Sequence, residues 1–370
     1  MNIISDVVLY FVFVALTGCF VILPFVGRKN LAFGVSIPRS EYNSKEIRKE
    51  RISSLLPFLL VGAVALISAI LGFRFLSERN AAMVFTALVL AQILAYMLIF
   101  LAFRKRVKRI KEEKGWDKEA RDIKVVDTAF ASKGKIACSF KWFWLYPLVI
   151  GATVFVGLYF YDLAPDRIPI QINSIGNVAR YVDKSVLSVL YPVIIQVFMS
   201  LLFMFVFYTF IKTPPMIDPE NAEESSKQNM IFRYRWSVFT VAGGLVMMLN
   251  FFGQELSIVG LITMGTAFYF TIGTVILIVI AAVVLSITTG QSGSRVRIGK
   301  TKDGEKINRD DDKYWKAGMF YFNKEDPAMF VEKRFGIGMT VNFANRKAVL
   351  IFVGVMLFVV VIAIVSSTIK

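Results

Sequence analysis

The chain has 370 residues, of which 56% are hydrophobic and 19% charged, and its formal net charge is +16. A soluble domain normally contains about 45–50% apolar and about 25% charged residues, so the composition argues against a soluble protein and predicts a polytopic membrane protein. Histidine is absent, which excludes His-based metal sites, Ser-His and Cys-His nucleophile pairs, and His pH sensors.

The fold class that we predict is an all-α polytopic membrane protein with about eight transmembrane helices, since a bilayer core requires about 20 apolar residues in a helix. The sixth apolar run is the shortest, and the seventh is longer than one crossing needs, which predicts a tilted, kinked or extended helix. The first run lacks a basic segment before it, so we expect no cleavable signal peptide. The eight runs are residues 3–26, 53–76, 81–103, 142–163, 185–211, 236–252, 256–289 and 348–368.

The Lys and Arg residues predict the orientation of these helices. The odd-numbered connections between the runs hold 37 of the 43 Lys and Arg residues. Because basic residues concentrate in cytoplasmic loops, we expect these connections inside the cell and both termini outside. All of the net charge then faces the anionic lipids of the inner leaflet, and we expect this lipid contact rather than binding to nucleic acid.

The connections divide the chain into five predicted regions. Residues 104–127 are mostly charged, and we expect a helix that leaves the third span and breaks near Gly115, solvated or lying on the inner leaflet. A helix that binds a partner is the alternative for this segment. Residues 212–235 predict a flexible loop or an ordered cap, and residues 290–312 predict a linker. The regions are a three-helix membrane region with two basic cytoplasmic loops (1–141), a helix-loop-helix unit with outer loop 162–184 (142–211), a cytoplasmic loop with the sixth and seventh spans (212–289), a cytoplasmic linker with a small aromatic β-rich module (290–347), and the last span (348–370).

The polar residues inside the spans give no sign of catalysis. Glu255 lies near an outer end, and Gln92, Gln196 and Asn250 are more often helix–helix hydrogen-bond partners than transport sites. The adjacent glycines Gly243 and Gly244 permit close helix approach or a bend. No Walker A, GxSxG, HExxH or CxxC motif occurs, and Cys19 and Cys138 are far apart in the chain. We therefore predict a non-enzymatic protein without a cofactor or a metal.

The outer loop has an internal pattern. Pro165 and Pro169 favour extended backbone, and the isoleucines within 168–172 alternate with other residues, so one face is apolar. A turn is expected around Gly176. These features predict an ordered hairpin that lies over the outer ends of the helices, as a recognition or a capping element.

This loop resembles the motif of the SdpI-like bacterial membrane proteins, the family of the immunity protein against the Sdp toxin. Gln171 stands where that family has a histidine, and Ala179 stands where it usually has an aspartate. Gln171 can donate and accept hydrogen bonds but carries no charge, so chemistry that needs those two groups is absent here. The matching residues are Pro165, Asp166, Ile168, Pro169, Asn173, Gly176, Tyr181 and Lys184.

The region before the last span resembles a small uncharacterised module that accompanies this loop motif in Gram-positive membrane proteins. Its aromatics, turn residues and alternation predict short strands that pack on other loops or on the membrane surface. The residues that carry the resemblance are Trp315, Tyr321, Asn323, Asp326, Gly336 and Gly338.

The resemblance implies an immunity or envelope-stress-sensing protein in the bacterial cytoplasmic (plasma) membrane. Its outer loop would recognise an extracellular peptide or envelope molecule, and its cytoplasmic loops would contact a membrane or cytoplasmic protein partner. An accessory subunit of a larger membrane complex and a transporter or flippase stay open as alternatives. The ligand-binding candidates in the outer loop are Asp166, Arg167, Pro169, Gln171, Asn173, Gly176, Tyr181 and Lys184.

Overall fold

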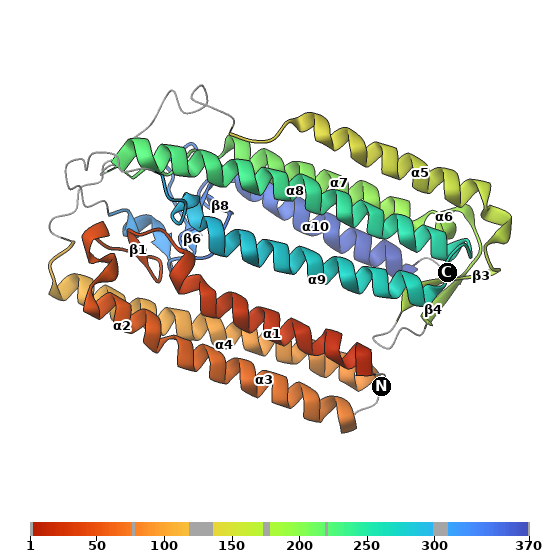
Figure 1. The fold of residues 1–370 in the computed structure, drawn as a ribbon, viewed down its shortest axis with the longest axis horizontal. Helices are drawn as coiled ribbons and strands as arrows, with labels where there is room; N and C mark the ends of the chain where they lie inside the picture. Colours follow the sequence, from red (N-terminus) through yellow and green to blue (C-terminus); the bar gives the residue numbers. More distant parts are fainter. Residues whose placement is uncertain are drawn as a thin grey trace.

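The computed structural model describes residues 3–75, 78–117, 136–172, 178–218, 221–298 and 310–368. Within them, seven helices are long and apolar enough to cross a membrane, and a further helix, α10 (Arg346–Thr368), covers the eighth expected run. The long helices lie side by side along the longest axis of the molecule (Figure 1). Both termini lie at the same end as strands β3 and β4, which we call the hairpin end, and the other small strands lie at the opposite, module end (Figure 1).

The first three membrane helices form one group. They are α1 (Ile3–Val26), α3 (Leu55–Phe75) and α4 (Glu78–Glu113), and the short helix α2 (Lys45–Ser53) leads into α3. Gln92 on α4 is buried and donates hydrogen bonds to Thr17 Oγ1 (3.1 Å) and Tyr96 Oη (2.8 Å). The prediction that Gln92 joins helices is therefore confirmed.

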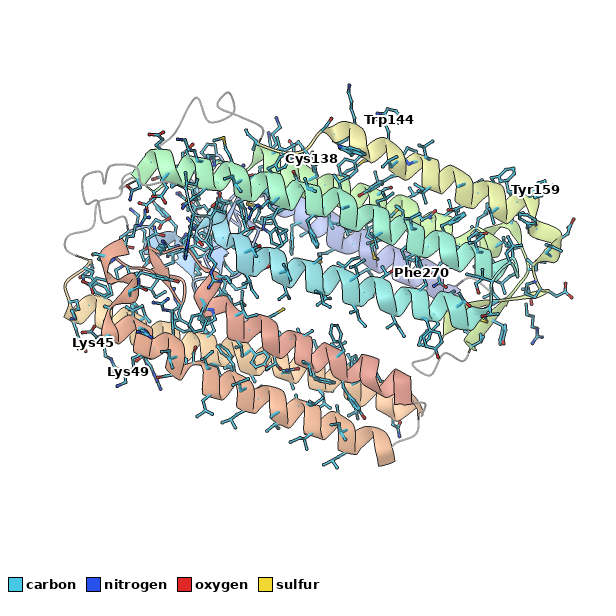
Figure 2. The ribbon with its side chains drawn as sticks, viewed as in Figure 1. Lys45, Lys49, Cys138, Trp144, Tyr159 and Phe270 are labelled. Carbon is cyan, nitrogen blue, oxygen red and sulfur yellow. The ribbon has the colours of Figure 1, made fainter. Side chains whose placement is uncertain are left out.

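A second group forms around α8 (Ala222–Ile258), which packs against α5 (Leu145–Tyr159), α7 (Tyr191–Lys212) and α9 (Met264–Thr289). The Tyr146 hydroxyl of α5 donates to the Val241 carbonyl at 2.9 Å, at a place where Gly244 carries no side chain that would overlap it. Gly244 thus allows α5 and α8 to approach closely, as predicted for the pair of glycines. Trp144, directly before α5, and Tyr159, the last residue of α5, point away from the bundle (Figure 2), as expected for side chains that face lipid.

Two expected boundaries are wrong. Helix α8 begins at Ala222, inside the expected loop 212–235, and Glu223 and Glu224 occupy its first turn, where acidic side chains stabilise a helix. The expected run 256–289 is interrupted by a turn in which Gly260 has φ +78°, and α9 begins at Met264. That turn explains why the run seemed too long for one crossing.

The charged extension of the third span is a straight continuation of α4, and a turn with Gly115 at φ +68° follows it. The predicted helix and its break are confirmed for the described residues up to 117. One face of the extension is buried against protein, since Val107, Lys111 and Trp116 have exposures of 0%, 4% and 7%. The prediction that this extension is solvated or lies on the inner leaflet is therefore wrong for its described residues.

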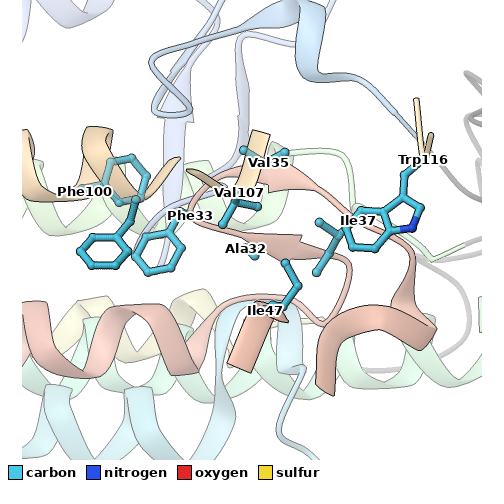
Figure 3. Packing of buried hydrophobic residues seen from close by; sticks show 9 residues of the cluster. Ala32, Phe33, Val35, Ile37, Ile47, Phe100, Val107 and Trp116 are labelled. Atoms are coloured by element: carbon cyan, nitrogen blue, oxygen red, sulfur yellow. The ribbon is translucent and has the colours of Figure 1, made fainter. Parts of the chain in front are cut away.

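The small strands form two-stranded antiparallel pairs. The pair β1 (Leu31–Ala32) and β2 (Val35–Ser36) follows α1, and its turn packs Phe33 against Phe100 and Phe103 of α4 (Figure 3). The expected β-rich module is confirmed for the described residues from 310. Its strands are β5 (Trp315–Lys316), β6 (Phe320–Tyr321), β7 (Phe330–Glu332) and β8 (Met339–Val341).

The expected linker 290–312 is only partly described. Its first residues form the short 3-10 helix η5 (Gln291–Gly293), which is buried. Gln291 exchanges two hydrogen bonds with the backbone of Gly338, at 3.1 and 2.9 Å. The start of the predicted linker, residues 290–293, is therefore packed and docks the module onto the helices.

Candidate functional site

The hairpin predicted from the outer loop is present. Strand β3 (Arg167–Ile172) pairs antiparallel with β4 (Val178–Asp183), with irregular register around Gln171. Its apolar face is turned inward, since Ile168 is 0% and Val182 is 3% exposed. They pack in a cluster with Ile258 and Val259 at the end of α8, so the hairpin covers the ends of the helices.

Lys184 closes the base of the hairpin. Its ammonium donates to the carbonyl oxygens of Ala164 (2.8 Å) and Asp162 (3.4 Å) and lies over the Tyr161 ring at 4.8 Å. Ser185 and Ser188 then form a capping box that starts α6 (Val186–Val189). These contacts give Lys184 a structural role in the described hairpin.

A cavity of about 440 Å³ lies below the hairpin, and we call it the hairpin cavity. Helices α7, α8 and α9 form its walls, and Pro169 of β3 contributes from the hairpin. Its size suits a small ligand or part of a peptide. The lining residues that come from the helices are Tyr191, Pro192, Ile195, Met247, Asn250, Phe251, Gln254, Ser257, Ile258, Met264, Phe268, Thr271, Thr274 and Val275.

One wall of the hairpin cavity is polar. Gln254 Nε2 donates to Thr271 Oγ1 at 2.7 Å, and the Thr271 hydroxyl donates to Asn250 Oδ1 at 2.9 Å. This series of hydrogen bonds joins α8 to α9, which confirms that Asn250 is a helix–helix hydrogen-bond partner. It also leaves amide and hydroxyl groups beside an apolar space, an arrangement that can fix the orientation of a mostly apolar ligand.

Glu255 directly follows Gln254 in the sequence, but its side chain faces α5 and does not line the hairpin cavity. It is 0% exposed, and neither carboxyl oxygen has a hydrogen-bond partner among the described residues. A side chain at Gly157 of α5 would overlap its carboxyl group. Sequence reasoning placed Glu255 near an outer end and missed its complete burial, which only the packing of α5 against α8 produces.

The structure places the predicted ligand contacts of the outer loop in different positions. Asp166, Arg167 and Tyr181 are exposed on the hairpin, while Pro169 lines the hairpin cavity. Gln171 lies in β3 by its backbone pairing with Arg180. Asn173 and Gly176 lie outside the described residues, as does the expected turn between the strands.

The predicted residues of the module mostly hold it together. Trp315 packs on Tyr321 at 5.0 Å, and the Tyr321 hydroxyl donates to Asp326 Oδ2 at 2.8 Å. Asn323 Nδ2 donates to the Tyr321 oxygen at 3.2 Å. Gly336 and Gly338 have φ values of +83° and +106°, which residues with a side chain rarely adopt.

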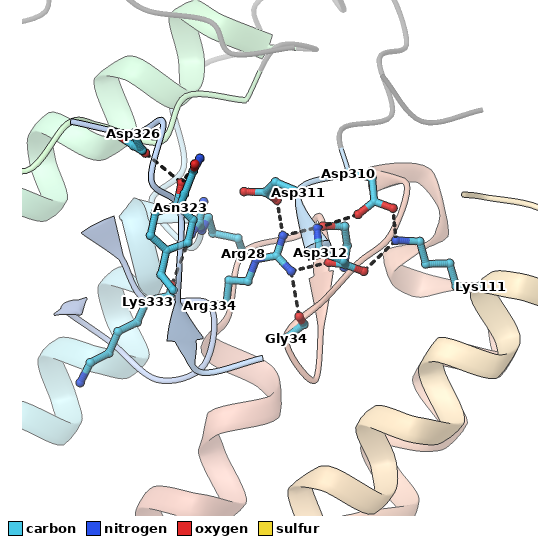
Figure 4. Close-up of polar contacts among 12 residues, drawn as sticks. Arg28, Gly34, Lys111, Asp310, Asp311, Asp312, Asn323, Asp326, Lys333 and Arg334 are labelled. Atoms are coloured by element: carbon cyan, nitrogen blue, oxygen red, sulfur yellow. Dashed lines mark hydrogen bonds and ion pairs between the residues drawn. The ribbon is translucent and has the colours of Figure 1, made fainter. Parts of the chain in front are cut away.

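An ion cluster that the sequence did not reveal attaches the module to the first helix group. Arg334 binds Asp311 and Asp312, and Lys111 of α4 binds Asp310 (2.6 Å) and Asp312 (2.8 Å) (Figure 4). Burial alone would raise the pKa of Asp312, but Arg334 and Lys111 outweigh it and lower the pKa to about 2. These acids are paired with cations, and the described residues contain no group of three or more Cys, Asp or Glu that could hold a metal ion.

A second ion pair attaches the module to α8. Glu332 of β7 and Arg233 of α8 are 0% and 1% exposed and lie 3.3 Å apart. The same carboxylate accepts from Asn229 Nδ2 at 2.7 Å and from the Ser292 hydroxyl. The Arg233 guanidinium also donates to two carbonyl oxygens at the end of α7, so this pair joins α7, α8, η5 and the module.

Two family models match parts of the chain. Residues 148–195, which include the hairpin, match a domain of unknown function (DUF1648). Residues 324–349, in the module, match a family of unknown function (DUF5808). No curated protein and no solved structure matches the chain. The matched segments include the hairpin at one end of the helix bundle and part of the module at the other. The protein is an integral membrane protein with domains of unknown function.

Proposed function

We propose that this chain is a non-enzymatic membrane protein of the SdpI-like type that binds a mostly apolar peptide at its hairpin end. The observation that carries the proposal is the 440 Å³ cavity, apolar on most sides and polar along Gln254, Thr271 and Asn250, with Pro169 of the hairpin at its edge. A peptide that partitions into the bilayer could place an apolar side chain in the cavity and bond its backbone to the amides.

The orientation and location form part of the same proposal. The module end carries the basic connections, so it faces the cytoplasm of a bacterial cell and the hairpin end faces outside. The hairpin would then meet peptides in the envelope, in keeping with immunity or envelope-stress sensing. The module, fixed by two ion clusters, offers the surface for a cytoplasmic or membrane partner.

A binding experiment tests the proposal. Purified protein in nanodiscs is titrated with a panel of fluorescently labelled apolar antimicrobial peptides, alongside Thr274→Phe, which fills the hairpin cavity. Leu277→Phe is the matched control, since Leu277 lies on the same helix, is 56% exposed and does not line the cavity. We expect at least one peptide to bind and Thr274→Phe to weaken it about tenfold or more. Equal binding by the two variants, or no binding above that of empty nanodiscs, would contradict the proposal.

A second candidate function, transport, is favoured by Glu255. A buried carboxyl group without a partner inside a membrane bundle is a common feature of proton-coupled transport. The test is solute or lipid flux in proteoliposomes, with Glu255→Gln expected to abolish any proton-dependent flux. The accessory-subunit alternative predicts a stoichiometric partner on purification from membranes.

A further inference from the structure

A second cavity, of about 550 Å³, lies at the module end between α7, α8, α10 and the β7–β8 hairpin. We call it the module cavity. Its walls are mainly aromatic and aliphatic side chains, and among the described residues Lys333 is the single charged one that lines it. The aromatic residues are Phe203, Phe205, Phe210, Trp236, Phe239, Phe330, Phe343 and Phe352.

Two donors of the module cavity lack acceptors among the described residues. Lys333 points away from the ion cluster of Arg334 (Figure 4), and burial lowers its pKa with no nearby acid to offset this. Its neighbour Glu332 is committed to Arg233, Asn229 and Ser292. The indole N–H of Trp236 is buried without a hydrogen-bond partner. A buried cation and a buried N–H group without acceptors are stabilised by an anionic ligand or by one that is rich in oxygen atoms.

The module cavity continues along the helices. A further cavity of about 390 Å³ shares Leu202 and Val355 with it, and the described residues that line it are apolar side chains and one glycine of α7 and α10. Along α7 the two cavities run from Phe210 to Phe198, which is about 18 Å at 1.5 Å per residue. One leaflet of a bilayer core is about 15 Å deep. The two neighbouring cavities, which we together call the α7–α10 groove, therefore extend along α7 over about the length of an acyl chain.

We propose that the α7–α10 groove binds one acyl chain of an anionic phospholipid, whose phosphate pairs with Lys333 and whose oxygens accept the Trp236 N–H. The aromatic walls exclude water from the chain, and the charge of the head group meets the unpaired ammonium. Bound lipid would fill the space between α10 and the rest of the bundle and hold the module against the helices. This site is separate from the hairpin cavity and does not depend on the function proposed for it.

The test is lipid retention measured by native mass spectrometry after exchange into phosphatidylglycerol or phosphatidylcholine with the same acyl chains. The wild-type protein should retain phosphatidylglycerol about tenfold more than phosphatidylcholine. Lys333→Gln should remove this preference, while Lys324→Gln should keep it, because Lys324 lies in the same module but is exposed and outside the cavity.

A second variant tests the groove without touching the charge. A side chain at Gly354 of α10 would meet no atom within 4 Å, so Gly354→Leu can project into the groove without displacing backbone. It should reduce the retention of both lipids. The proposal would be overturned if the wild type retained the two lipids equally or if the two lysine variants had equal effects. It would also be overturned if the protein were a dimer that retains no lipid. If Lys333→Gln does not fold, unchanged retention in Gly354→Leu overturns it alone.

Discussion

The buried pair of Arg233 and Glu332 permits a quantitative prediction. Glu332→Gln keeps the size of the side chain but removes the Glu332 charge that faces the Arg233 guanidinium, which is 1% exposed. Removing one partner of a buried ion pair typically costs about 3–5 kcal/mol. We expect about 3 kcal/mol, because two carbonyl oxygens of α7 and Asn229 Oδ1 still accept from the guanidinium.

The assay is a double-mutant cycle of Arg233→Met and Glu332→Gln, with chemical unfolding in micelles followed by tryptophan fluorescence. The two changes should be coupled by about 2 kcal/mol, since each single variant removes one side of the same buried ion pair. The same cycle on the exposed pair Glu223 and Lys227, which lie 2.7 Å apart on α8, should give less than about 0.5 kcal/mol. Additive effects at Arg233 and Glu332, within about 0.5 kcal/mol, would refute the role given to this pair.

Three further changes test other parts of the fold by the same unfolding assay. Gly244→Ala should cost about 1–3 kcal/mol because its Cβ would overlap the Tyr146 hydroxyl, whereas Gly243→Ala meets no atom within 4 Å and should stabilise by up to about 1 kcal/mol; equal effects would contradict the packing. Asp312 has a pKa lowered to about 2, so its stabilisation is complete above about pH 5 and is lost as the pH falls towards 2; Asp312→Asn should cost about 2 kcal/mol at pH 7 and remove this dependence. Glu255→Gln should leave the free energy of unfolding unchanged or higher, because the carboxyl group has no hydrogen-bond partner among the described residues; a loss above about 1 kcal/mol would show a contact that its burial does not explain.

The helices were predictable because each apolar run must satisfy its own backbone in the bilayer. The boundaries that failed have local causes. A turn at Gly260 is apolar on both sides, so hydropathy alone could not divide 256–289. Helix α8 starts among charged residues that hydropathy assigns to a loop, although Glu223 and Glu224 are suitable for a first helical turn.

The contacts between distant segments were not predictable. The alternation of 168–172 indicated the hairpin and its buried face, and Ile168 is indeed buried. Nothing in the sequence joined Arg233 to Glu332, 99 residues away, or Lys111 to Asp312, 201 residues away. Charged residues in loops are normally solvated, and only the packing of the module on α4 and α8 shows which of them are paired.

Helix α8 contributes to both proposed sites, which raises the question of whether they influence each other. Asn250 in the hairpin cavity and Arg233 beside the module are 17 residues apart, or about 26 Å along the helix. Energetic effects at sites this far apart usually add. We therefore expect Thr274→Phe to leave phosphatidylglycerol retention unchanged and Lys333→Gln to leave peptide binding unchanged. A cross-effect above about threefold would mean that α8 moves as a rigid unit and transmits binding at one end to the other.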